Sequence, residues 1–204
     1  MRVQRDVHPI EAKSYRIMRD RVDTGRLPPH SRAVVERVIH ATADTSWVGE
    51  LYTDEAVLAA GRAALMNGAP IVTDARMVAA GITSRECVVA LDLPGVADLA
   101  RSEHLTRSAA GIRLAARRHP DGAVWVIGNA PTALLELVDR CGADALRPAL
   151  VVAVPVGFVD AVASKSQVRA IGVPVVSNPG ERGGASVAAA IVNALLYFDE
   201  EAHR

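Results

Sequence analysis

Aromatic residues are scarce in this sequence. Two Trp, three Tyr and two Phe make up 3% of its 204 residues. A basic excess is also lacking, because 23 Lys and Arg balance 23 Asp and Glu. Proteins that bind single-stranded nucleic acid stack its bases on aromatic side chains, and nucleic-acid binders in general carry a basic patch or stripe. We therefore expect no nucleic-acid partner.

Cysteine is rare as well. Cys87 and Cys141 lie in unrelated segments, so they make neither a metal-ligand spacing nor a disulfide framework. No cluster of His and Cys in the sequence suggests zinc. The composition therefore predicts no metal site, and it predicts two buried thiols in a reducing cytoplasm.

Apolar stretches long enough to cross a bilayer are missing too. The longest ones, 149–159 and 187–198, are too short or too interrupted by Pro, Gly and Asn. Residues 1–6 lack the apolar core of a signal peptide. We therefore expect a cytoplasmic protein that makes no contact with a membrane.

What the sequence does contain is an alternation of short apolar segments and helical patterns. The five apolar segments, which we predict to be strands, are 70–74, 87–91, 124–127, 150–154 and 173–176. Strands that alternate with helices form a parallel sheet covered on both faces. The pattern predicts one domain over residues 1–204, of class α/β, with a three-layer α/β/α arrangement and a mainly parallel five-stranded sheet.

Extra N-terminal helices precede the first predicted strand. The first spans 9–23, and the second carries Arg37 and His40 and ends before Asp44. The third opens at 53–55, where the hydroxyl of Thr53 is the expected cap, and it stops at 67–68.

Arg37 and His40 are the first candidate site residues. They are three positions apart, so they share one helix face, and a guanidinium beside an imidazole can hold an anion and move a proton. Spacing alone favours a plainer interpretation, in which His40 interacts with the carbonyl end of its helix. Ser14, in the first helix, is on the same grounds an ordinary solvent-facing serine.

The loops that follow the strands hold the other candidates, because ligands of such sheets bind at the carboxyl ends of the strands. The last loop, 177–186, offers backbone N–H groups and a helix start to an anion, or is merely a turn. It matches neither a P-loop nor a dinucleotide fingerprint. A helix start alone would also explain Asn129 and Thr132, and Arg107 fits an ordinary surface arginine. These residues together indicate an α/β enzyme for an anionic small molecule, with a His as the proton handler.

Four motifs resemble one family. They are Arg-x-x-His-Ala at 37–41, Thr-Arg-Ser-Ala at 106–109, Gly-Asn-Ala-Pro-Thr-Ala-Leu at 128–134 and Pro-Val-Gly-Phe-Val at 155–159. Their order is that of the precorrin-8X methylmutases, and the resemblance covers nearly the whole chain. It implies a flavodoxin-like fold and a homodimer that holds its substrate near the subunit interface. It further implies that a methyl group moves from carbon 11 to carbon 12 of precorrin-8X, giving hydrogenobyrinate in cobalamin biosynthesis, by a 1,5-sigmatropic shift without a redox cofactor.

The resemblance also implies roles for residues. His40 would be the catalytic proton donor and acceptor, whereas Ser14, Arg37 and Arg107 would contact the substrate. Four further candidates for substrate binding lie in the strand-exit loops, namely Asn129, Thr132, Gly183 and Gly184.

This sequence departs from the family's pattern at three places. Ala163 stands where a Glu is frequent, and Ala43 stands where Gly is common. Glu181, Arg182 and Ala185 alter the last loop, where the family usually has Arg-Gly-Arg-x-Gly-Gly-Ser. The altered loop motivates one alternative, a non-catalytic corrinoid carrier of the same pathway. A second alternative is an unrelated α/β enzyme that acts on a nucleotide or acyl substrate through this Gly-rich loop. The substrate of the methylmutase can be metal-free or contain cobalt.

Overall fold

Five short strands form the centre of the structure, a computed structural model that describes residues 8–199. The strands are β1 (Ile71–Thr73), β2 (Val88–Val89), β3 (Val124–Ile127), β4 (Leu150–Ala153) and β5 (Val175–Ser177). All neighbouring strands are parallel, and their order is β2-β1-β3-β4-β5. This is the flavodoxin-type order of a doubly wound sheet, so the predicted fold class is confirmed. Residues 1–6, for which we expect no signal peptide, lie outside the described part of the chain.

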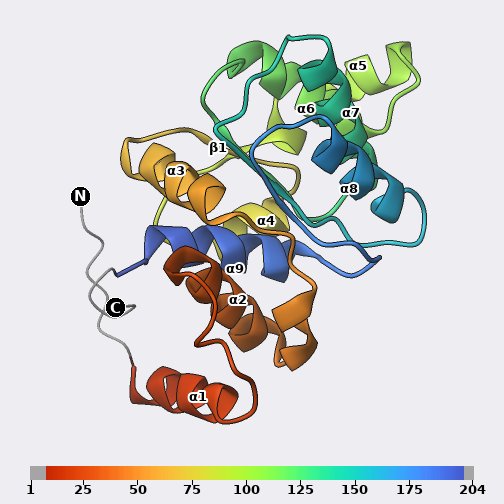
Figure 1. Cartoon of the computed structure of the whole chain (residues 1–204). Coiled ribbons are helices and arrows are strands. Elements are labelled where there is room, and N and C mark those ends of the chain that lie inside the picture. Colours follow the sequence, from red (N-terminus) through yellow and green to blue (C-terminus); the bar gives the residue numbers. More distant parts are fainter. Residues whose placement is uncertain (1–7, 200–204) are drawn as a thin grey trace.

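Helices cover both faces of the sheet (Figure 1). They are α1 (Pro9–Arg19), α2 (Pro29–Thr42), α3 (Glu55–Met66), α4 (Arg76–Gly81), α5 (Val96–Ser102), α6 (Arg107–Arg118), α7 (Pro131–Gly142), α8 (Ala161–Ala170) and α9 (Ala185–Leu196), with short 3-10 turns η1 (Thr45–Gly49) and η2 (Ala90–Asp92). Strand residues alternate between the faces, because successive side chains of a strand point to opposite sides. Val124 and Val126 pack with α2, α3 and α9, whereas Trp125 and Ile127 pack with α6, α7 and α8.

Helix α9 is the helix that links the sheet to the N-terminal part of the chain. Every residue from Val187 to Leu196 is buried, because α9 packs against the sheet on one side and α2 on the other. A Cβ atom at Gly128 would lie 2.7 Å from the Cβ of Ala188, so a glycine after β3 lets this loop approach the start of α9 closely. The carboxyl edge of the sheet and the start of α9 therefore meet at one place.

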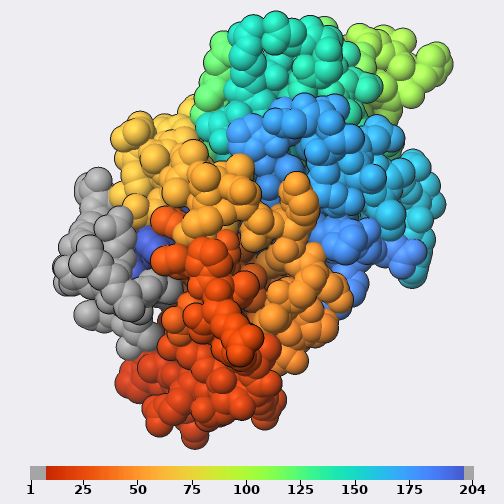
Figure 2. Space-filling view, in the orientation of Figure 1, coloured from red at the N-terminus to blue at the C-terminus, as the bar shows by residue number. Residues whose placement is uncertain are grey.

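Helix α1 is the outermost element. Only Met18 of its residues is buried, and Figures 1 and 2 show the helix at the edge of the molecule, beyond α2. Its polar contacts with α2 are described below with the site.

The structure corrects several predicted boundaries. The first helix ends at Arg19 and not at residue 23, and Thr24, beyond its end, donates its hydroxyl hydrogen to the carboxylate of Glu36. The third helix is capped by Asp54 rather than Thr53, and the Asp54 carboxylate accepts a hydrogen bond from the N–H of Val57. Residues 87–91 contribute only two strand residues, since the chain turns into η2 at Ala90.

Two other expectations can be compared with the structure. Cys87 and Cys141 are unpaired thiols that are partly rather than fully buried, and burial raises the pKa of Cys141 to about 11. Among residues 8–199, none of the helices combines the length and the apolar character needed to cross a lipid bilayer.

Candidate functional site

A cleft of about 560 Å³ lies between α1, α2 and α9. Helix α1 contributes Glu11 and Ser14, and α2 contributes Arg37 and His40. On both helices these residues are three apart, so each pair shares a helix face. The sequence-predicted residues Ser14, Arg37 and His40 thus meet in one place.

The α9 wall of this cleft is made of small side chains. Ser186, Ala189, Ala190 and Asn193 lie at helical spacing along one face of α9, and Gly81 at the end of α4 joins them. Small residues let a ligand approach the helix closely. The cleft therefore has a charged rim on α1 and α2 and a mainly apolar floor on α9.

His40 is held by two contacts with α1. The hydroxyl oxygen of Ser14 lies 2.9 Å from His40 Nδ1, and the Tyr15 ring stacks on the imidazole with 4.9 Å between centroids and 9° between planes. Ser14 thus engages the Nδ1 side of the imidazole. The plain interpretation, a helix-end histidine that only contacts carbonyl groups, does not describe this arrangement.

Arg37 keeps its charge in a partly buried position. Its Nη1 donates to Glu11 Oε1 at 2.6 Å and to the Tyr15 hydroxyl at 3.3 Å. Burial alone would lower the pKa of Arg37, but the hydrogen bonds and charges of Tyr15 and Glu11 outweigh burial and raise it. For the Tyr15 hydroxyl, burial is the largest effect and raises the pKa. Among the described residues only Nη1 of Arg37 has a protein partner, so Nη2 and Nε can hold a ligand carboxylate.

Glu36 of α2 links the two helices through hydrogen bonds to Arg19 of α1. Its carboxylate, only 1% exposed, accepts hydrogen bonds from both Nε and Nη2 of Arg19, from Thr24 and from Arg32, at 2.6 to 3.0 Å. Burial raises the pKa of Glu36, yet these hydrogen bonds and the Arg19 charge together lower it below its ordinary value. The sequence alone did not indicate this residue, although it links α1, which carries Ser14, to α2, which carries His40.

A second group of predicted residues lies elsewhere. Arg107 begins α6 and Thr132 lies in the first turn of α7, and the two helix starts are joined by a 2.8 Å hydrogen bond between the hydroxyls of Thr106 and Thr132. Asn129 precedes α7 at the carboxyl end of β3. None of Arg107, Asn129 and Thr132 lines the cleft that contains His40.

Asp74 occupies the crevice between the ends of β1 and β3. Its fully buried carboxylate accepts hydrogen bonds from the N–H groups of Gly128 (3.1 Å), Asn129 (2.8 Å) and Ala130 (2.7 Å). Burial raises the pKa of Asp74, and the three N–H groups act against this increase. Backbone N–H groups at this point hold ligand anions in other doubly wound proteins, but here they already hold a carboxylate.

The Gly-rich loop, which is the last loop at residues 177–186, is packed and not open. The N–H of Gly184 donates to the Val154 carbonyl at 2.9 Å, and a Cβ at Gly183 would lie 2.1 Å from that same oxygen. Buried Lys165 donates to Asn178 Oδ1 (2.9 Å) and to the carbonyls of Gly180 and Arg182 (both 2.6 Å). Burial, helped by the Arg169 charge, lowers the pKa of Lys165 to about 8. In the described chain, Gly183 and Gly184 therefore shape the loop, and their contact with a substrate stays a prediction.

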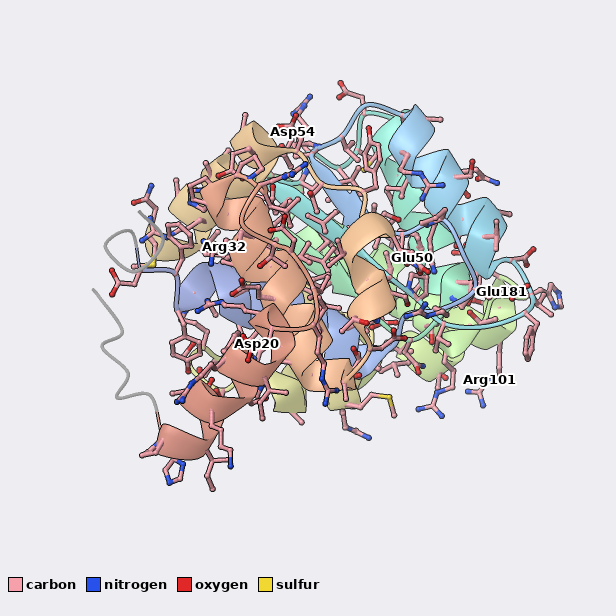
Figure 3. All side chains as sticks on the ribbon, turned by 60° about the horizontal axis from the view of Figure 1, so that its bottom comes forward. Asp20, Arg32, Glu50, Asp54, Arg101 and Glu181 are labelled. Atoms are coloured by element: carbon pink, nitrogen blue, oxygen red, sulfur yellow. The ribbon has the colours of Figure 1, made fainter. Side chains whose placement is uncertain are left out.

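Arg182 joins the Gly-rich loop to η1. Its guanidinium contacts Asp44 (2.6 Å), Ser46 (2.8 Å) and Glu50 (3.1 Å), and it lies over the Trp47 ring at 4.5 Å. Figure 3 shows Glu50, directly after η1, and Glu181, in the loop before α9, on the same side of the molecule. The arginine of this altered loop thus has a structural partner on the segment that follows His40.

Asn193 has one unusual atom. Its side-chain nitrogen donates to the Gly81 carbonyl at 2.7 Å, while its buried oxygen has no hydrogen-bond partner within residues 8–199.

No group of three or more His, Cys, Asp or Glu side chains that could hold a metal occurs within residues 8–199.

Comparisons with known proteins agree with this architecture. A family model described as precorrin-8X methylmutase matches residues 9–198. The chain is 41% identical over 199 residues to the precorrin-8X methylmutase of Pseudomonas aeruginosa, across 94% of this chain and 95% of that protein. It is 39% identical over 165 residues to the cobalt-precorrin-8 methylmutase of Methanocaldococcus jannaschii, across 81% and 78% of the two chains.

A solved structure gives the same result. The precorrin-8x methyl mutase from Thermus thermophilus matches with a TM-score of 0.84 and 34% identity, across 94% of this chain and 98% of that one. The family model covers α1 and α2 as well as the sheet. The chain belongs to the precorrin-8X methylmutase family.

Proposed function

We propose that this enzyme moves the methyl group on carbon 11 of precorrin-8X to carbon 12, giving hydrogenobyrinate in cobalamin biosynthesis, by a 1,5-sigmatropic shift assisted by His40. The observation that supports this role most directly is the position of His40 in the wall of the cleft, with Nδ1 held 2.9 Å from the Ser14 hydroxyl. The methyl group migrates within one molecule, so no side chain has to carry it.

The Ser14 hydroxyl suits a histidine that both gives and takes a proton. A serine hydroxyl can donate to an unprotonated Nδ1 or accept from a protonated one, because its hydrogen rotates. His40 can therefore have its proton on either ring nitrogen without losing this contact. In the proposed reaction, Nε2 exchanges a proton at ring C of the substrate and stabilises the electron arrangement from which the methyl group migrates.

The walls of the cleft fit a carboxylate-bearing macrocycle. Arg37 has two nitrogens available for an acetate or propionate group, and the small side chains of Ala189 and Ala190 provide a floor for a flat apolar ring system. This combination is consistent with a chain of zero net charge, since the cationic groups are local.

We extend the proposal to a homodimer with the substrate near the subunit interface. Arg107, Asn129 and Thr132 lie outside the His40 cleft, so a substrate that contacts both groups would need a wider site than this cleft. Large apolar side chains are exposed on α1 and after β4, where Ile10 is 72% and Phe158 is 92% exposed. Sedimentation of the purified protein at several concentrations tests this part, and a monomer at all of them would contradict it.

The test of the function is a direct assay. The purified enzyme is incubated with precorrin-8X, and the visible spectrum is followed for the chromophore of hydrogenobyrinate. We expect turnover by the unmodified protein and loss of turnover in His40→Ala, with product binding largely kept. An unchanged spectrum, or full activity in His40→Ala, would contradict the proposal.

A carrier without catalytic activity is the second candidate. The exposed Glu181 supports it, because this acidic residue replaces an expected arginine, and the neighbouring Arg182 is engaged by Asp44 and Glu50. The same assay separates the two functions, since a carrier would bind hydrogenobyrinate tightly and leave precorrin-8X unchanged.

A further inference from the structure

Tyr15 contacts both residues of the Arg37–His40 pair. Its ring stacks on the His40 imidazole, and its hydroxyl accepts a hydrogen bond from Arg37 Nη1 at 3.3 Å. Tyr15 itself is not part of the cleft lining, and its partly buried ring packs against the main core. Tyr15 therefore contacts His40 and Arg37 without itself lining the cleft.

A single hydrogen bond does not fix an imidazole well. Rotation about the bond between Cβ and the His ring has broad minima that are roughly two-fold, so the Ser14 contact at Nδ1 restrains one atom but leaves the ring plane loosely defined. A parallel ring at 4.9 Å restrains the plane itself. Together, the two contacts restrain both the ring plane and the direction in which Nε2 points.

Tyr15 has support of its own. The Arg19 guanidinium, one turn later on α1, lies 5.7 Å from the Tyr15 ring centroid while it also binds buried Glu36. The Tyr15 ring is thus placed by the α1–α2 connection and does not depend on a ligand.

We infer that Tyr15 is a positioning residue of the active site, whose ring sets the plane of the His40 imidazole and whose hydroxyl sets the Arg37 guanidinium. It touches neither the substrate nor the reacting atoms. Its effect on turnover rests on the proposed methylmutase function, whereas its effect on the His40 ring does not.

Two substitutions separate the ring from the hydroxyl. Tyr15→Phe keeps the stacked ring and removes the partner of Arg37. Tyr15→Leu removes the ring as well. If the leucine variant does not fold, Tyr15→Met is the second variant without the ring. We expect kcat to fall about 10-fold or more in Tyr15→Leu with little change in KM, because a displaced catalytic group loses much of its contribution. In Tyr15→Phe, we expect kcat within about 3-fold of the unmodified enzyme and a higher KM, since Arg37 is less well placed.

NMR of the His40 ring provides a readout that does not need turnover. In the unmodified protein and in Tyr15→Phe, the ring current of residue 15 should shift the His40 Hε1 resonance upfield, and Tyr15→Leu should abolish that shift. Met18→Ala is the matched control, because it removes a buried side chain of the same helix without touching His40. It should lower the melting temperature while leaving the His40 resonance and kcat close to those of the unmodified enzyme.

The outcomes are distinct. An unchanged His40 resonance and kcat in Tyr15→Leu would overturn the inference, and so would an equal loss of kcat in Tyr15→Phe and Tyr15→Leu. Met18→Ala could also lose kcat and the His40 shift as Tyr15→Leu does. Tyr15 would then only help to hold α1 in place, and the inference would be overturned. If the unmodified protein shows no turnover but its His40 resonance still depends on the Tyr15 ring, the methylmutase function is contradicted and the positioning role of Tyr15 is not.

Discussion

Ser14 on α1 and His40 on α2 are 26 positions apart in the chain, yet their side chains meet at 2.9 Å. Ser14→Ala should therefore lower kcat by about 10-fold to 100-fold, because His40 loses the partner that orients Nδ1. Steady-state kinetics with precorrin-8X measures the effect. Ser14→Thr keeps the hydroxyl and should recover most of the rate, so equal losses in both variants would contradict the orienting role.

Glu11 and Arg37 should have opposite effects on ligand binding. Arg37→Gln removes a guanidinium that can hold a carboxylate, so the Kd for hydrogenobyrinate should rise by about 10-fold. Glu11→Gln removes a negative charge from the same wall of the cleft and should lower the Kd by about 3-fold. Asp98→Asn, on a residue whose side chain is 79% exposed on α5, is the charge-matched control and should change nothing. Weaker binding in Glu11→Gln would mean that Glu11 chiefly positions Arg37.

Glu36 should make the stability of the protein depend on pH. Its pKa is lower in the folded protein than in the unfolded chain, because the hydrogen bonds from Arg19, Thr24 and Arg32 outweigh the effect of burial. Its contribution is therefore complete above the ordinary glutamate pKa of about 4.3 and is lost as the pH falls through the lower folded-state pKa.

Urea unfolding at several pH values measures this contribution. At pH 7, Glu36→Gln should lower the free energy of unfolding by about 1–3 kcal/mol, and the difference from the unmodified protein should shrink in acid. A difference that stays constant from pH 7 to pH 3 would exclude the ionised carboxylate as its source.

Ala43 ends α2 in a left-handed conformation, with φ at 54° and ψ at 27°. A side chain with a Cβ is strained in this region, which is why glycine suits the position. Ala43→Gly should stabilise the protein by about 0.5–1 kcal/mol and raise the melting temperature by about 1–4 °C. Ala60→Gly, at an exposed position within α3, should instead destabilise it by about 1 kcal/mol. Calorimetry of both variants checks the sign, and a destabilised Ala43→Gly would contradict the strain.

The sheet could be predicted from the sequence because its signal is local. The apolar segments around Val124 and Leu150 are short, continuous and followed by helical patterns, and they are the two four-residue strands of the structure. The strand at 87–91 was predicted too long, because an apolar run does not reveal that the chain turns into η2 at Ala90. The caps were harder still, since both Thr53 and Asp54 can cap a helix.

The site could be predicted only in part. The three-residue spacing of Arg37 and His40 indicated a shared helix face, and the family resemblance singled out Ser14. No pattern of spacing connects Tyr15 or Ser14 to His40, because those contacts arise when α1 folds back on α2. The same holds for Glu36, whose partner Arg19 is 17 positions away, and for Lys165, which binds the loop after β5.

The carboxylate of Asp74 has a consequence for where ligands can bind in this fold. In flavodoxin-type sheets the crevice between the first and third strands is the usual place for a cofactor's phosphate, and here a side chain of the protein itself fills that role. The cleft with His40 lies instead between α9 and the helices α1 and α2, which precede the sheet in the chain. Under the proposed function, the catalytic histidine therefore comes from an N-terminal helix that precedes the doubly wound part of the chain, and not from a loop at the carboxyl edge of the sheet.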